Sequence, residues 1–124
     1  MTEALLALWD GAFGSSYAIW SATLVRSAPL LWLGLGVALA FRAGVLNIGA
    51  EGQFLMGALG ATAMAQVVGR SVPGLVMIPL MALVGGVAGA GWAGIAAWLR
   101  QRFGVLEVIS TIMLNFIALA TIGW

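Results

Sequence analysis

The sequence predicts an all-α membrane protein, a fragment of a polytopic bundle of transmembrane helices with a glycine-rich helix break. Composition is the first observation: 63% of the 124 residues are hydrophobic and 7% are charged, whereas a soluble domain carries about 25% charged residues. Charge spacing is the second. The five basic and four acidic residues leave long uncharged stretches at 27–41, 52–69, 71–99 and 108–124. A helix crosses a hydrocarbon core of about 30 Å with about 20 apolar residues.

The elements follow in order from this spacing. Residues 1–18 combine Trp9, Phe13 and Tyr17 with small residues, a mixture typical of the headgroup zone, so we expect an interfacial segment. Four spans are expected after it, at about 19–41, 52–68, 76–99 and 106–124. The glycine-rich residues 42–53 separate the first two spans, and Gly, Ser and Pro mark the turn at 69–74.

The arginines predict the orientation of the spans. Short cytoplasmic loops are enriched in basic residues, so we expect Arg100, Arg102 and Arg42 inside and the turn at 69–74 outside. The N-terminus then lies outside without a signal sequence, which predicts a span before residue 1. The chain is still apolar at Trp124. We therefore expect residues 1–124 to be one partial domain, truncated at both ends.

Small residues in the third expected span predict a tight helix contact. They form two rows at i, i+4 spacing: Ala82, Gly86, Ala90 and Gly94, and Gly85, Gly89, Ala93 and Ala97. Small side chains let helix backbones approach closely in lipid, although glycine is also common in membrane helices generally. We expect leucine at Gly86 or Gly89 to disrupt packing more than leucine at Gly60.

Asn47, Glu51 and Gln53 form the first set of polar residues that lipid would penalise. One interpretation is a helix N-terminus, with Asn47 as the cap and the Glu51 carboxylate at the positive end of the dipole. The other is a discontinuous helix whose unwound backbone faces a solute cavity. Both stay open from the sequence alone.

Glu107, Thr111 and Asn115 form the second set. At 100° per residue they share one face of the fourth expected span. Such a stripe either lines a transport path or makes hydrogen bonds with a neighbouring helix. The six residues of the two sets are our candidates for a transport path.

Several classes of function lack the residues they need. The sequence contains no Cys and no His, which excludes disulfides, thiolate chemistry, imidazole catalysis and the usual zinc sites within these residues. We therefore expect no catalytic residue and no metal site. A net charge of +1 without any Lys argues against a nucleic-acid surface.

Two long motifs, in this order, resemble one known family. They are FRAGVLNIGAEGQFLMGALGA at 41–61 and FGVLEVISTIMLNFIA at 103–118, and residues 11–41 are also similar in order and spacing. The family comprises the permeases of the branched-chain amino acid and ribose importer superfamily, in particular its nucleoside-uptake branch. Ribose-type permeases are expected to have a different, aspartate-bearing motif at 47–53, which favours nucleosides.

The resemblance implies a permease subunit of an ATP-driven importer for nucleosides or related sugar-containing solutes. Such an importer has two permease subunits, a cytoplasmic ATPase that binds the ATP, and an external substrate-binding lipoprotein. No cofactor is then expected in this chain, which would be a multi-pass protein of the cytoplasmic, or inner, membrane. The family's coupling segment for the ATPase lies beyond these residues. The alternatives are a ribose or simple-sugar permease, a secondary transporter or channel subunit, a membrane-embedded enzyme, and a purely structural subunit.

Overall fold

Every regular element in the computed structural model, which describes residues 1–69 and 72–123, is a helix. This confirms the all-α prediction. The elements are α1 (Thr2–Phe13), the π-helical η1 (Ala18–Leu24), α2 (Val25–Arg42), α3 (Ala50–Val68), α4 (Gly74–Phe103) and α5 (Glu107–Ile122). They divide into two compact units, Met1–Gly36 and Val37–Trp124.

The first unit is held together by local contacts between α1 and η1. The Thr23 hydroxyl donates a hydrogen bond of 2.8 Å to the carbonyl of Ala12. The rings of Trp9 and Phe13 lie 4.9 Å apart within α1. Ala18 is its one buried hydrophobic residue, so most of this unit's apolar side chains remain exposed. An interfacial role for residues 1–18 stays a prediction.

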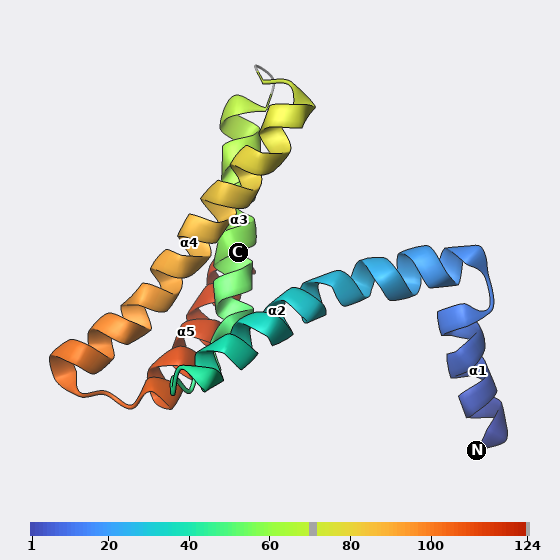
Figure 1. The fold of residues 1–124 in the computed structure, drawn as a ribbon, viewed down its shortest axis with the longest axis horizontal. Coiled ribbons are helices and arrows are strands. Elements are labelled where there is room, and N and C mark those ends of the chain that lie inside the picture. The colour runs from blue at the N-terminus through green and yellow to red at the C-terminus, as the bar shows by residue number, and fades with distance from the viewer. Residues whose placement is uncertain (70–71, 124) are drawn as a thin grey trace. The chain divides into compact units, whose positions relative to one another are not determined.

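The second unit contains the helices that build the site. α3 and α4 form an antiparallel hairpin, and α5 lies beside α3 (Figure 1). Gly49 is opposite Thr111 and Gly52 is opposite Asn115, so α3 and α5 run in the same direction where they meet. The buried residues here are more often small or polar than large: Gly49, Gly52, Ala96, Ser110, Thr111 and Ala118 accompany Met77 and Leu114.

Glycines bring the backbones of α3 and α4 into direct contact. A Cβ atom on Gly57 would lie 2.9 Å from the carbonyl oxygen of Gly85, and one on Gly85 would lie 3.0 Å from that of Gly57. A Cβ on Gly89 would lie 2.9 Å from the carbonyl oxygen of Gln53. No other residue type fits these positions without moving a helix, because the obstacles are backbone atoms.

The structure separates the two rows of small residues in α4. Gly85 and Gly89 are half-buried against α3, whereas the row of Ala82, Gly86, Ala90 and Gly94 is exposed within the described chain. A Cβ on Gly60, however, would lie 2.7 Å from that of Ala88. We expected leucine at Gly86 to disrupt packing more than leucine at Gly60, and for the α3–α4 contact this is wrong. Gly86 follows Gly85 directly, and consecutive residues on a helix point about 100° apart, so Gly86 faces away from α3.

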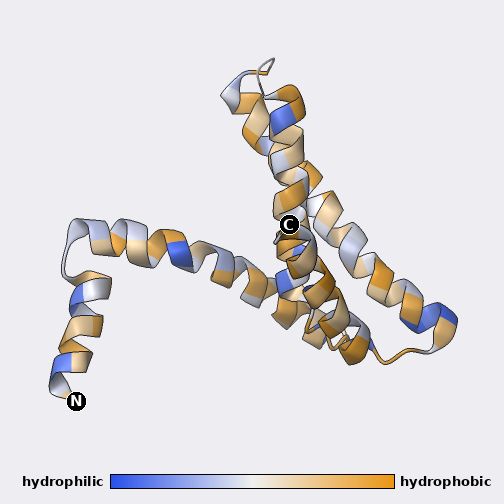
Figure 2. Ribbon diagram, turned by 180° about the vertical axis from the view of Figure 1, so that it is seen from behind, coloured by the Kyte–Doolittle hydropathy of each residue, from blue (hydrophilic) through white to orange (hydrophobic). Residues whose placement is uncertain are grey.

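Two of the described helical segments are long and apolar enough to cross a membrane. They are Ala18–Arg42, with 25 residues, and Gly74–Phe103, with 30 residues. At a rise of 1.5 Å per residue the latter is about 45 Å long, so it exceeds the hydrocarbon core. Hydrophobic residues dominate α4 up to its strongly hydrophilic C-terminal end (Figure 2).

The other two expected spans correspond to shorter or more polar helices. α3 has 19 residues but includes Glu51, Gln53 and Gln66, and α5 has 16 residues. Whether they cross the membrane stays a prediction. So does the external position of the turn at 69–74, in which Arg70 and Ser71 lie outside the described residues.

Two glycines in the left-handed conformation end the helices around the site. Gly104, with φ of 67°, terminates α4 and donates its N–H to the carbonyl of Arg100 at 3.0 Å. Gly44, with φ of 75°, follows α2. Such φ values favour glycine. The non-helical segment 43–49 and the short connection 104–106 then lead into α3 and α5.

Candidate functional site

A cavity of about 250 Å³ lies in the second unit, where α3 begins, α4 approaches its end and α5 begins. Its lining residues are polar on one side and small or aliphatic on the other. They are Val45 and Asn47 from the connection, Gln53 from α3, Ala93, Gly94, Ala96 and Ala97 from α4, and Glu107 and Thr111 from α5. Four of the six candidate path residues therefore meet at one cavity.

Asn47 and Gln53 bind each other through both parts of their amide groups. Asn47 Nδ2 donates to Gln53 Oε1 at 3.1 Å, and Gln53 Nε2 donates to Asn47 Oδ1 at 3.0 Å. Asn47 Oδ1 also accepts the backbone N–H of Gly49 at 2.9 Å. This pair fixes the non-helical connection to the first turn of α3 and orients both amides at the cavity wall.

Thr111 is fixed by its own helix and by a glycine. Its side chain is almost fully buried, and its hydroxyl donates to the carbonyl of Glu107, at 2.8 Å. A Cβ on Gly49 would lie 2.9 Å from Thr111 Cβ. The connection before α3 can therefore pass directly over α5 only because Gly49 has no side chain.

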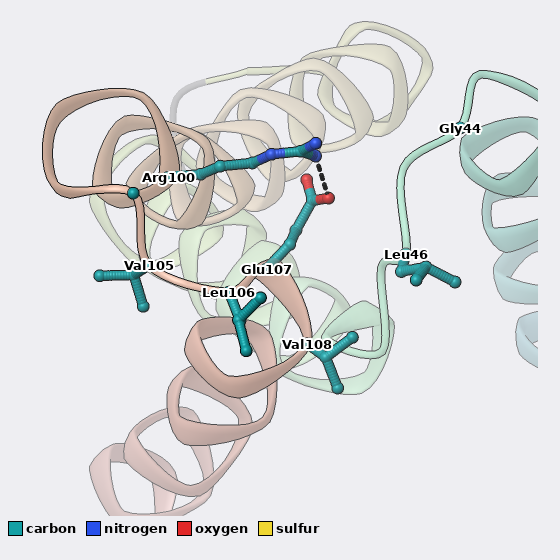
Figure 3. Close-up of a pocket in the computed structure, with 8 residues that line it drawn as sticks. Gly44, Leu46, Arg100, Val105, Leu106, Glu107 and Val108 are labelled. Atoms are coloured by element: carbon teal, nitrogen blue, oxygen red, sulfur yellow. Dashed lines mark hydrogen bonds and ion pairs between the residues drawn. The ribbon is translucent and has the colours of Figure 1, made fainter.

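Glu107 lines both this cavity and a second pocket of about 410 Å³ (Figure 3). One carboxylate oxygen, Oε2, forms an ion pair with Arg100 across the turn at Gly104. The Glu107 side chain is 13% exposed and that of Arg100 is 52% exposed. The arginine of this ion pair is therefore exposed and the glutamate is mostly buried. The pair links the last turn of α4 to the first turn of α5.

Asn115 does not line the cavity; its amide hydrogen bonds go to the backbone before and within α3. Its Oδ1 accepts the N–H of Gly52 at 2.8 Å, and its Nδ2 donates to the carbonyl of Ile48 at 3.0 Å. A Cβ on Gly52 would lie 2.7 Å from that Oδ1. Of the two interpretations of the α5 stripe, hydrogen bonding to a neighbouring helix is what the structure shows for Asn115.

The N-terminus of α3 is capped from another helix. Gly49 is the N-cap and has no side chain, so the free N–H of the third helical residue, Gly52, is satisfied by Asn115. Asn47 instead binds the N–H of Gly49. Glu51 is exposed in the first turn and is not part of the cavity wall, a position where its carboxylate favours the helix dipole.

Sequence reasoning missed two features of this site. Arg100 was interpreted only as a topology signal, although opposite charges on either side of a short glycine turn indicate an ion pair with Glu107. The walls supplied by α4 were also missed, because alanine and glycine carry no chemical signal. The cavity offers hydrogen-bond donors, acceptors and room for a small polar molecule.

Two of the described helical segments are long and apolar enough to cross a membrane, as expected of an α-helical membrane protein. Comparison with known proteins gives the family: residues 19–123 match the model of the permease component of branched-chain amino acid transport systems. The chain belongs to this family.

Relatives whose names state a substrate are similar over most of the chain. The chain is 52% identical to the glucose ABC transporter permease protein of Haloferax volcanii over 77% of its length, covering 24% of that relative. It is 42% identical to the guanosine ABC transporter permease protein of Bacillus subtilis over 91% of its length, covering 32% of it. It is 40% identical to the nucleoside ABC transporter permease protein of Lactococcus lactis subsp. cremoris over 90%, covering 30%. The chain thus spans about a quarter to a third of these relatives. No solved structure matches it.

Proposed function

We propose that this chain forms part of the translocation path of an ATP-driven importer for nucleosides or related sugar-containing solutes. The observation that carries the proposal is the cavity at which Asn47, Gln53, Glu107 and Thr111 meet. Polar groups in apolar helices are costly unless they bind each other, a neighbouring helix or a solute. The amide pair retains hydrogen-bonding capacity after its internal bonds are counted, which suits a path for polar solutes.

In this proposal other subunits bind the ATP that drives transport and deliver the substrate. The importer would combine this permease with a second permease subunit, a cytoplasmic ATPase that binds ATP, and an external substrate-binding lipoprotein. The permease itself would have no ATPase site and would be a multi-pass protein of the cytoplasmic membrane. Family membership supports this assembly.

The names of the relatives support two substrate classes. Guanosine and nucleosides occur in two of the names and glucose in a third. A simple-sugar permease is therefore the second candidate function. A solute that contains a sugar ring satisfies both, so the uptake experiment should include a nucleoside and a free hexose.

Filling the cavity should stop transport without stopping assembly. Ala97 lines the cavity and is exposed, so the larger side chain of Ala97→Leu should extend into the cavity without displacing a neighbouring helix. In the complete transporter we expect uptake of radiolabelled guanosine or glucose, per assembled complex, to fall about tenfold or more, a barrier increase of about 1.4 kcal/mol. Ala90→Leu is the matched control, because Ala90 is exposed on the same helix and does not line the cavity.

Two results would contradict the proposal. Equal uptake by the Ala97→Leu and Ala90→Leu variants would show that the cavity is not part of the translocation path. Undiminished uptake when the partner ATPase is inactivated would point to a secondary transporter or channel instead.

The proposed orientation has its own test. We expect Arg102→Cys in intact cells to be protected from an impermeant thiol reagent, because short cytoplasmic loops are enriched in basic residues and Arg100 and Arg102 stand together there, whereas Ser71→Cys should react. The absence of any native Cys gives a clean background within this segment. The reverse labelling pattern would show that the orientation is inverted.

A further inference from the structure

We infer that the cavity lined by Asn47 and Gln53 is a subsite for the sugar ring of the transported solute, which it recognises through ring hydroxyls. The inference rests on the proposed transport function and adds which part of the solute binds where. Its basis is the match between the free hydrogen-bonding groups of the wall and those of a polyhydroxylated ring.

The amide pair contributes free donors and one free acceptor. Each amide nitrogen carries two hydrogens, and the reciprocal bonds of Asn47 and Gln53 use one from each. One N–H of each residue therefore remains for a ligand. Asn47 Oδ1 already accepts two hydrogen bonds, from Gly49 and Gln53, whereas Gln53 Oε1 accepts one and retains a lone pair.

Acceptors from α5 complete the polar wall. Glu107 uses Oε2 in the ion pair with Arg100, which leaves its other oxygen for a hydroxyl of a ligand. The Thr111 hydroxyl donates its hydrogen within α5 and retains lone pairs. A hydroxyl group donates one hydrogen bond and accepts others. Adjacent hydroxyls on a ring can therefore satisfy the N–H groups and the acceptors of this wall together.

The size and the other wall of the cavity favour a single ring. A volume of about 250 Å³ lies below the roughly 300–1,000 Å³ of pockets that enclose drug-sized ligands. The wall formed by α4 consists of Ala93, Gly94, Ala96 and Ala97. These small residues admit the thickness of a sugar ring, whereas a nucleobase is typically held by stacking on aromatic side chains. We therefore place the sugar here and any base outside this cavity.

A variant-by-substrate experiment in the complete transporter tests the inference. Gln53→Met keeps an unbranched side chain of similar length but removes the amide. Uptake per assembled complex is measured for guanosine and for 2′,3′-dideoxyguanosine, and the preference for guanosine is the ratio of the two rates. Taking this ratio in each variant cancels the selectivity of the external receptor, which is unchanged.

We expect Gln53→Met to reduce the preference for guanosine about three- to tenfold, as the loss of one or two hydrogen bonds would do. Gln66→Met, at an exposed glutamine on the same helix, should leave the ratio unchanged. Equal loss of both substrates in Gln53→Met would overturn the sugar subsite and leave the transport function standing. If the unmodified transporter moves neither guanosine nor glucose with ATP, the proposed function itself fails.

Discussion

Leucine at Gly85 is expected to reduce the amount of folded permease, and with it the amount of assembled complex, strongly. A Cβ at this position would lie 3.0 Å from the carbonyl oxygen of Gly57 and 3.3 Å from the Cβ of Ala61. The nearest obstacle is helix backbone, so relief requires that α3 and α4 move apart and lose the contact between Gly89 and Gln53 as well. Overpacking costs about 1–3 kcal/mol. At the upper end of this range the equilibrium constant for folding falls about a hundredfold.

The adjacent glycine provides the control. Gly86→Leu places the same side chain one residue further, where a Cβ would meet no heavy atom within 4 Å among the described residues. The measurement is the amount and thermal stability of the detergent-solubilised complex for both variants of the full-length permease. We expect a large loss for Gly85→Leu and a small one for Gly86→Leu. Equal losses would contradict the α3–α4 contact as the reason.

Replacement of Asn115 by leucine is expected to destabilise the permease. Uptake should fall only in proportion to the loss of stable, assembled complex. The variant loses the acceptor for the Gly52 N–H and the donor for the Ile48 carbonyl. The part-buried Gly52 N–H, left unsatisfied, costs up to about 1–3 kcal/mol, and the exposed bond to Ile48 costs less. The first turn of α3 carries Gln53, so the cavity wall should loosen together with the fold.

Asn115→Asp separates the two hydrogen bonds. Aspartate keeps an acceptor for Gly52 and loses the donor to Ile48, so we expect a stability between those of the wild type and Asn115→Leu. Thr121→Val is a control on the same helix, because Thr121 is exposed and, among the described residues, its hydroxyl donates to the Ile117 carbonyl of its own helix. Normal amounts of stable Asn115→Leu complex with abolished uptake would show that Asn115 acts on the solute instead.

Residue composition and spacing were enough to predict the class of the protein and four of the residues that line its candidate site. Apolar stretches of helix length and scarce charges require helices in lipid, since an unsatisfied backbone is costly there. Asn47, Gln53, Glu107 and Thr111 were recognisable because a polar side chain in an apolar helix needs a partner. These inferences depend only on local composition and spacing, which the chain carries directly.

The hydrogen-bonding or packing partner of each group could not be predicted in this way, because it depends on how the helices pack. The rows of Gly85 and Gly86 look alike in sequence, but one meets α3 and the other is free in the described chain. Asn115 resembles Thr111 as a member of the same stripe, yet it caps α3 from 63 residues away while Thr111 lines the cavity. Helix periodicity gives the relative angle between residues on one helix. It does not give the rotation of that helix against its neighbours, and close backbone contacts at Gly49, Gly52 and Gly57 set that rotation here.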